Sequence, residues 1–228
     1  MQKQEAFLNK LANKLGRERR SGVTPPKWTD PGTHLYEGKT KEDLILQFIE
    51  SLNSLNTEVD RVQVEDLPSV LEKVVNKFNI SSSVLWDDER LQALGIETFF
   101  ASKGLEHQVW SASAGEATLR QAAARMDLGI AFAEMGLAEA GTVMLFNGGG
   151  KGRPVSLLPP VFLCILSEKT IVPRLTQAVR HIQAKVPEGL PACINFITGP
   201  SRTGDIEMDL ALGVHGPGKV HVILLKDF

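Results

Sequence analysis

The feature that most constrains the fold of this chain is the alternation of short apolar runs with helical patterns from about residue 40 onward. Apolar runs of strand length lie at 58–64, 83–86, 96–100, 128–133, 142–146, 161–166, 194–198 and 220–225. Helical patterns lie between them, at 40–54, 67–78, 87–95, 115–126, 173–185 and 204–212. This alternation predicts an α/β fold, doubly wound around a mostly parallel sheet. Loops at the carboxyl ends of the strands should then build the site.

The first 35 residues follow a different pattern. Residues 5–15 have the apolar spacing of a short amphipathic helix, and Gly16 ends it. The basic cluster of Arg17, Arg19 and Arg20 that follows fits either a solvated helix end or a contact with an anion or partner. Prolines and glycines crowd residues 21–35, which predicts an extended linker. We therefore expect an arm over 1–35, of the kind that packs on a neighbouring subunit of a homo-oligomer, and an α/β domain over 36–228.

Composition excludes several classes of protein. The formal net charge of −2 argues against a nucleic-acid binder, which needs excess Lys and Arg to neutralise phosphates. No apolar run approaches the roughly 18 residues that a membrane span requires. The first 20 residues interleave apolar and charged side chains, unlike a secretion signal. These features predict a cytoplasmic protein.

The two cysteines, Cys164 and Cys193, lie in apolar, β-branched segments, as expected of buried thiols. Two thiols without Cys-x-x-Cys spacing cannot hold an iron–sulfur cluster, which typically takes four thiolates. They also make no structural zinc site, and no histidines show metal-ligand spacing. We therefore expect no metal and no cofactor in this chain. Any redox chemistry is then handled elsewhere, or by a cofactor that the sequence does not announce.

Residues 138–160, AEAGTVMLFNGGGKGRPVSLLPP, combine a strand with a glycine run. Thr142 begins the strand, and Lys151 and Arg153 follow the glycines, so the loop could place backbone N–H groups and cations around an anion. It is not a Walker A loop, because Gly152 follows Lys151. Asn147–Gly148 is also a strong hairpin-turn signal, and a simple hairpin tip is the reading we prefer for the glycines.

Residues 196–218, FITGPSRTGDIEMDLALGVHGPG, predict a strand, a glycine turn and a helix. A helix that begins at such a turn offers free N–H groups to an anion, and Arg202 adds a guanidinium fork. Thr203 or Asp205 would cap that helix. The candidate anion- or substrate-binding residues are Thr142, Arg153, Gly199, Ser201, Arg202 and Thr203.

Three residues of the same stretch are candidate catalytic groups. Asp205 and Glu207 could accept a proton or bind a polar ligand. His215, which lies in the loop Gly213–Gly218, could act as a general acid or base, or could simply end the helix as a turn histidine.

The run TGPSRTGDIEMDLALGVHGPGKVHVILL resembles the C-terminal signature of the lactate utilization protein C family, whose domain is called LUD. EAGTVMLFNGGGKGRPVSLLPP and SEKTIVPRLTQAV resemble its central signature, and FLNKLANKLGRERR and VLWDDERL resemble versions found in bacilli. The resemblance covers essentially the whole chain. It implies a fold related to the sugar-phosphate isomerase and CoA-transferase superfamily. It also implies a part in a three-protein system that oxidises L-lactate to pyruvate, in which the two partners carry the iron–sulfur motifs.

Two other functions remain open from the sequence. One is a free-standing enzyme, similar to formyltetrahydrofolate cyclo-ligase or a CoA-transferase, that binds a ligand bearing phosphate or carboxylate. The glycine run with Lys151 favours it, and the missing Walker spacing counts against it. The other is a regulatory or scaffold protein without chemistry, because a fold does not fix a function.

Overall fold

The computed structural model describes residues 2–20, 22, 24, 32–111, 113, 115–206 and 209–228. The chain divides into two compact units, Met1–Glu37 and Gly38–Phe228. The first unit holds helix α1 (Gln2–Lys14) and a 3-10 turn, Thr33–Tyr36. Three apolar side chains of this unit, Phe7, Leu11 and Leu15, are 65%, 43% and 58% exposed, so the helical pattern at 5–15 forms a helix that leaves apolar surface uncovered.

The second unit contains the other helices and all the strands of the described residues. Its helices are α2 (Lys41–Ser54), α3 (Leu67–Phe78), α4 (Glu89–Ala93), α5 (Ile96–Ser102), α6 (Glu116–Ala123), α7 (Pro154–Leu157) and α8 (Leu175–Lys185). Its strands are β1 (Glu58–Val62), β2 (Ser82–Trp86), β3 (Glu106–Trp110), β4 (Leu128–Phe132), β5 (Met135–Leu137), β6 (Thr142–Asn147), β7 (Val161–Ser167), β8 (Ile171–Val172), β9 (Cys193–Ile197), β10 (Arg202–Ile206), β11 (Asp209–Leu212) and β12 (Lys219–Leu225).

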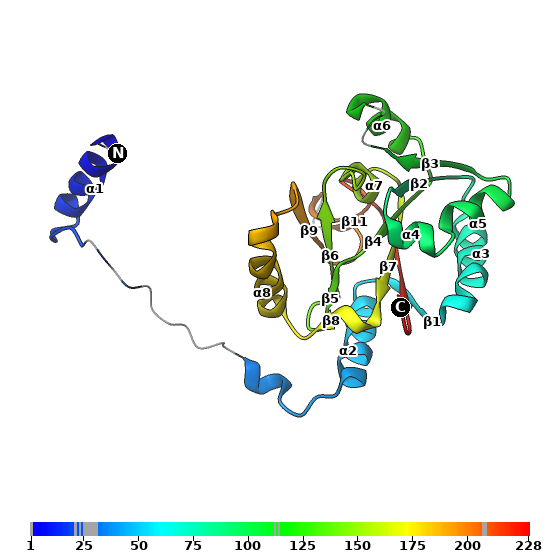
Figure 1. The fold of residues 1–228 in the computed structure, drawn as a ribbon, viewed down its shortest axis with the longest axis horizontal. Helices are drawn as coiled ribbons and strands as arrows, with labels where there is room; N and C mark the ends of the chain where they lie inside the picture. The colour runs from blue at the N-terminus through cyan, green and yellow to red at the C-terminus, as the bar shows by residue number, and fades with distance from the viewer. Residues whose placement is uncertain are drawn as a thin grey trace. The chain divides into compact units, whose positions relative to one another are not determined.

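Six strands form a wholly parallel sheet in the order β1-β12-β7-β4-β2-β3. Helices α3 and α5 lie on one side of this sheet, and α2 and a second sheet lie on the other (Figure 1). Every residue of β7 is buried, as expected for a parallel strand that is covered on both faces. The prediction of an α/β fold around a mostly parallel sheet is confirmed.

Local sequence signals explain where the helices begin and end. Thr40 caps α2 in a capping box, because its side chain accepts from the Asp43 N–H while Asp43 accepts from the Thr40 N–H. Pro68 lies in the first turn of α3, where no backbone donor is needed, and Asn79 ends the helix in the left-handed conformation.

The second sheet has the order β8-β5-β6-β9, and α8 packs on it through Ala178 against Met135 and Met144. Strand β9 runs antiparallel to β6, so the prediction of a parallel strand ending at Thr198 is wrong. The apolar content of residues 194–198 indicates a strand, but it carries no information about the direction of its neighbour.

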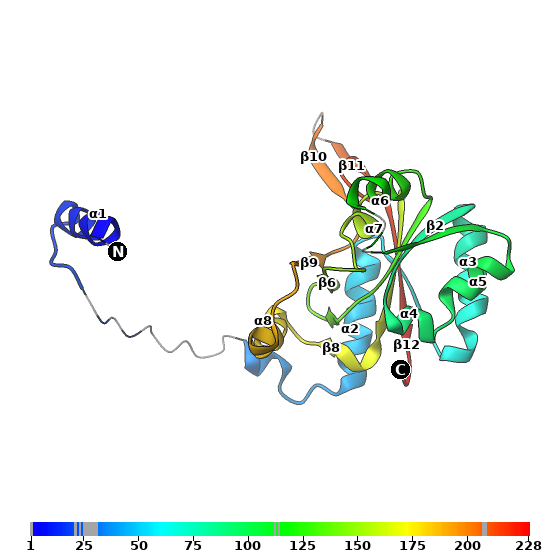
Figure 2. The ribbon, with the colours of Figure 1, turned by 45° about the horizontal axis from the view of Figure 1, so that its top comes forward.

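The predicted helix at 204–212 is also wrong, since β10 and β11 pair there as an antiparallel hairpin. Figure 2 shows this hairpin projecting from the rest of its unit. The order D-I-E-M-D-L from Asp205 to Leu210 alternates polar and apolar residues. That two-residue period is typical of a strand, and it should have outweighed the helical reading.

A third correction concerns residues 96–100, which form the first part of α5 instead of a strand. Gly95 adopts the left-handed conformation with φ of 65°, which lets the chain start a new helix directly after α4. Ile96 and Phe100, four residues apart, are both fully buried on one face of that helix. The strand that follows is β3, ten residues later than predicted.

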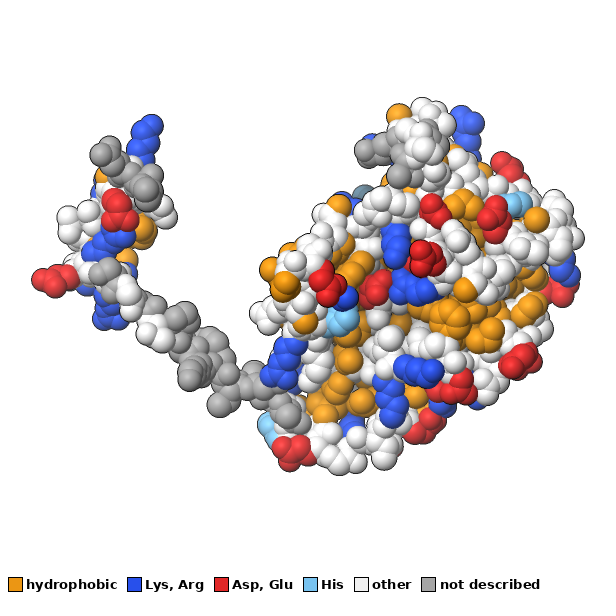
Figure 3. Space-filling model, in the orientation of Figure 1, with side chains coloured by type: hydrophobic (Ala, Val, Ile, Leu, Met, Phe, Trp, Pro, Cys, Tyr) orange, Lys and Arg blue, Asp and Glu red, His pale blue; other side chains and the backbone are white. Residues whose placement is uncertain are grey.

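None of the helices in the described part of the chain combines the length and apolar character that crossing a membrane requires. The face of the second unit drawn in Figure 3 mixes basic, acidic and apolar side chains, without one extended field of a single charge.

Candidate functional site

The carboxyl ends of three neighbouring parallel strands bring polar residues to one edge of the six-stranded sheet. Asp87 and Asp88 follow β2, and Glu134 comes two residues after β4, which pairs with β2. Trp110 ends β3 on the other side of β2. Open α/β sheets bind ligands outside this edge, so it is the first place to look for a site.

Four charged side chains are linked by ion pairs there, in the order Lys151, Asp88, Arg90 and Glu134. Arg90 holds both carboxylate oxygens of Asp88, at 2.9 and 2.6 Å, and its Nη2 also donates to Glu134 Oε1 at 2.7 Å. Lys151 Nζ lies 2.9 Å from Asp88 Oδ2. The guanidinium of Arg90 sits 4.4 Å above the ring of Phe132, a cation–π contact that fixes its plane.

Burial and pairing act in opposite directions on these groups. Burial raises the pKa of Asp88, but the hydrogen bonds from Arg90 and Lys151 outweigh it and set that pKa to about 2. Burial lowers the pKa of Arg90, yet its bonds to Asp88 and Glu134 leave it above the ordinary value. At neutral pH Asp88 and Arg90 are therefore charged and paired with each other, which suits a structural support better than proton transfer.

The glycine loop at 148–152 is hydrogen-bonded to the carboxyl end of β2. Gly148 and Lys151 exchange two backbone hydrogen bonds, so the chain turns at Gly149–Gly150, two residues after the position that the Asn-Gly signal predicts. It then continues into α7 and not into the strand of a hairpin. The Asp87 N–H donates to the Gly150 carbonyl at 3.0 Å, and Trp86 Nε1 donates to the Gly152 carbonyl at 2.9 Å. With Lys151 held by Asp88, the feature that favoured a nucleotide-binding loop is engaged in holding the turn.

Only glycine fits at position 152. A Cβ atom there would lie 2.1 Å from Cε2 of Trp110, so the backbone runs directly against the indole ring. This close approach is a structural reason for that glycine, and it fixes the position of the next residue, Arg153.

A pocket of about 350 Å³ opens beside this loop, and we call it the glycine-loop pocket. The loop itself, Trp110 of β3, Leu119 of α6 and Cys193 of β9 contribute to its lining. Asn147 is buried in it and is held from two sides, since its side chain donates to the Lys151 carbonyl and accepts from Asn195 Nδ2 at 2.9 Å. Of the predicted site residues, Arg153 lies here.

The predicted anion site around Arg202 lacks the helix on which it depended. Arg202 begins β10, and its guanidinium donates to the carbonyl of Leu55. The Ser201 N–H is bonded to Pro217, and the Gly213 N–H is bonded to Ser201, each at 2.9 Å. The turn at Gly199–Ser201 is therefore tied to the loop Gly213–Gly218, and it presents no helix N-terminus to a ligand.

Three predicted residues nevertheless meet. Gly199, Ser201 and His215 line a pocket of about 210 Å³ between the two sheets, near the amino ends of β7 and β12. Thr142 Oγ1 lies 2.7 Å from Thr198 Oγ1 at the start of β6. Thr203 pairs with Ala211 in the hairpin and does not line that pocket.

Two predicted catalytic residues cannot be placed in a site. Asp205 belongs to β10, but the structure does not describe its side chain, and Glu207 lies outside the described residues. The binding and catalytic roles of all these residues stay predictions.

Sequence reasoning missed the network of Asp88, Arg90, Glu134 and Lys151. A signal was present, because two consecutive aspartates directly follow the apolar run of β2. Glu134 and Lys151 are far from Asp88 in the sequence, at 46 and 63 positions, so only the folded sheet shows that they share its edge.

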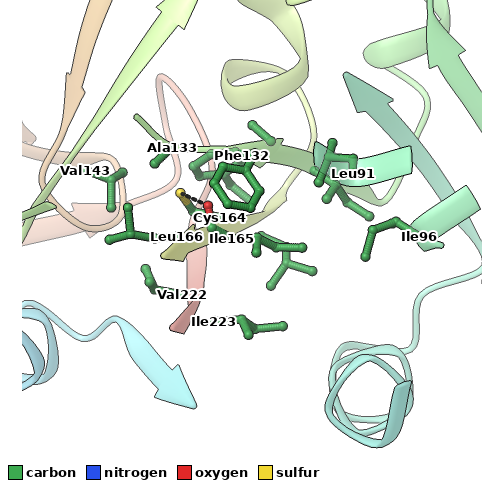
Figure 4. Close-up of a cluster of buried hydrophobic side chains, with 14 of the residues drawn as sticks. Leu91, Ile96, Phe132, Ala133, Val143, Cys164, Ile165, Leu166, Val222 and Ile223 are labelled. Carbon is green, nitrogen blue, oxygen red and sulfur yellow. Dashed lines mark hydrogen bonds between the residues drawn. The ribbon is translucent and has the colours of Figure 1, made fainter. Parts of the chain in front are cut away.

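The two cysteines lie on different sheets, Cys164 on β7 and Cys193 on β9. Cys164 is fully buried among apolar side chains such as Phe132 and Val222, and its Sγ contacts the Ile165 carbonyl (Figure 4). Burial raises the pKa of this thiol far above its ordinary value. No group of three or more His, Cys, Asp or Glu side chains within the described ranges is arranged to hold a metal ion.

The parallel six-stranded sheet, the mixed second sheet and the helices around them define an α/β protein with a pocket at the carboxyl edge of its main sheet. The chain belongs to the LUD domain family, whose family model matches residues 45–225.

It is 43% identical to lactate utilization protein C 1 of Bacillus mycoides, over 100% of this chain and 98% of that protein. It is 39% identical to lactate utilization protein C of Halalkalibacterium halodurans, over 100% of this chain and 99% of that protein. The protein of that name in Bacillus subtilis is also 39% identical, over 100% of this chain and 98% of that protein.

Among solved structures, the chain resembles a DUF162 family protein from Deinococcus radiodurans, with a TM-score of 0.61 and 21% identity. The match covers 82% of this chain and 99% of the other. At this identity the likeness supports the fold alone.

Proposed function

We propose that this chain is a cytoplasmic component of L-lactate utilization, acting with iron–sulfur partner proteins that oxidise L-lactate to pyruvate. In that reaction lactate loses two electrons and two protons, one proton from the hydroxyl group and one from the carbon that bears it, and the partners' clusters accept the electrons. The chain's own part is to bind and position a small molecule or a partner.

The observation that carries the proposal is the likeness to lactate utilization protein C over the full length of the chain, at 43% identity in one bacterium and 39% in two others. The likeness spans both the arm and the α/β unit, so it reaches beyond a shared domain.

The division of labour rests on the cysteines. An iron–sulfur cluster typically takes four thiolates, and this chain has two, which lie on separate sheets. The residues of this chain do not fit such a cluster, so electron transfer falls to the partners.

Deletion of the gene in its own host tests the proposal. We expect growth on L-lactate as sole carbon source to be lost, while growth on pyruvate is unchanged, because the missing step lies between the two. A plasmid copy of the intact gene should restore growth on L-lactate. Unchanged growth of the deletion strain on L-lactate would contradict the proposal, and equal loss on both acids would place the defect after pyruvate.

A further inference from the structure

We infer that the glycine-loop pocket binds an organic anion that is larger than lactate and that carries an apolar body. The inference concerns the pocket itself and holds whether or not the chain serves lactate oxidation. It stands on the charge of the pocket, its fixed shape, its size and its place in the fold.

The charge of the pocket favours an anion. The charged residues among those that line it are Lys151 and Arg153, and both are basic. Lys151 is paired with Asp88. Arg153 is exposed, and within the described ranges its guanidinium has no hydrogen bond or ion pair, so it is the cation that can meet a ligand. A guanidinium fork matches a carboxylate or a phosphate, which both offer paired oxygens.

The shape of the pocket is fixed before any ligand arrives. The turn that forms one wall is bonded to Asp87 and Trp86 at the end of β2, and Gly152 lies against the Trp110 ring. Arg153 follows directly, as the residue that precedes α7. A preformed wall lowers the ordering cost of binding, because little backbone freedom remains to be lost.

The size of the pocket exceeds what lactate needs. One water molecule takes roughly 30 Å³ of the liquid, so the six non-hydrogen atoms of lactate take at most about half of the 350 Å³ available. The rest of the lining is largely apolar, with Leu119, Pro154 and Ala192 beside Trp110. Burial of apolar surface is favourable, so the ligand that gains most here fills this space with an apolar group.

The place of the pocket agrees with ligand binding. It lies at the carboxyl end of β3 and beside the turn attached to β2, within the parallel sheet. Ligands of open α/β sheets bind at this edge. The second sheet closes the pocket from the other side through Cys193 of β9.

Calorimetric titration of the full chain with five defined probes tests the inference. The probes are L-lactate, inorganic phosphate, 3-phenyllactate, phenyl phosphate and uncharged 3-phenylpropanol. We expect 3-phenyllactate or phenyl phosphate to bind at least about tenfold more tightly than L-lactate or phosphate, since each adds an apolar ring to the same head group. The tighter of the two identifies the head group as a carboxylate or a phosphate. The uncharged alcohol should bind weakly.

Two variants assign the binding to this pocket. Arg153→Gln should weaken the better phenyl-bearing anion by about tenfold or more, because it removes a charge-assisted contact. Ala192→Phe should fill the apolar part, weakening the phenyl-bearing anions while leaving phosphate unchanged. Arg125→Gln is the matched control, since this exposed residue precedes β4 at the opposite edge of the sheet and should change nothing.

Several results would overturn the inference. They are equal affinity for lactate and its phenyl derivative, no binding of any probe at millimolar concentration, or full binding by a folded Arg153→Gln variant. Growth of the deletion strain on L-lactate reports on the proposed function separately, so the two can fail independently.

Discussion

Among single residues, Asp88 is the one whose chemistry depends most on the fold. Its side chain is 2% exposed, and its carboxylate is held by Arg90 and Lys151. A buried charge is tolerated only while its partners remain, so this carboxylate and its two cations support one another. Through Lys151 the network also holds the turn that shapes the glycine-loop pocket.

Replacing Asp88 with Asn should lower the free energy of unfolding at neutral pH by about 2–4 kcal/mol, because it leaves two partly buried cations without their carboxylate. The folded pKa of about 2 lies below the ordinary 3.8, so this carboxylate stabilises the fold above pH 3.8. That contribution, about 2 kcal/mol, is lost as the pH falls from 3.8 towards 2. Urea unfolding at pH 7 and at several values between 5 and 2.5 measures both effects.

Asp87→Asn is the control for this prediction. Asp87 is the exposed neighbour of Asp88, and its Oδ1 accepts a hydrogen bond from Gln92 Nε2 at 2.8 Å. Removing its charge should change the free energy of unfolding by less than about 0.5 kcal/mol. If Asp88→Asn is as stable as the parent and keeps the same acid dependence, the ion network does not form in solution.

Among the elements, α1 is the helix that belongs to a different compact unit from the α/β unit. It belongs to the unit Met1–Glu37, and Phe7 and Leu11 of the helix, with Leu15 directly after it, are exposed. An exposed apolar stripe on a short amphipathic helix is typical of a segment that packs against a partner.

Deletion of residues 1–20 should leave the α/β unit folded and weaken association, either with a second copy or with the lactate-oxidising partners. Circular dichroism measures the first effect, and light scattering with co-purification measures the second. A triple variant, Phe7→Ser, Leu11→Ser and Leu15→Ser, keeps the arm but removes its apolar stripe, and it should weaken association to a similar degree. Loss of folding in the truncated chain would mean that the arm belongs to the core.

For the whole molecule, the proposed division of labour predicts that the purified chain is colourless and free of iron. Four thiolates are needed for a typical cluster, and the chain has one deeply buried thiol and one half-buried thiol on another sheet. Iron analysis and the visible spectrum after anaerobic purification measure this. Stoichiometric iron with charge-transfer bands in the isolated chain would contradict it, whereas iron that appears only when the partners co-purify would support it.

The sequence by itself determined the class of the fold, most of the helices and five of the six strands of the parallel sheet, all but β3. Apolar period and helix caps are local, and residues such as Thr40, Pro68 and Gly95 act on their immediate neighbours. The whole-length resemblance likewise needed only the order of the residues, and the LUD family match confirms it.

Tertiary structure alone decided the direction of β9, the pairing of β10 with β11, and the partners of Asp88. An apolar strand pairs as readily with an antiparallel neighbour as with a parallel one, and its own residues do not record which it meets. Asp88, Glu134 and Lys151 come together because β2 and β4 pair in the sheet and the glycine turn folds back onto the end of β2. That meeting depends on contacts between distant parts of the chain, and it created the pocket in which Arg153 lies.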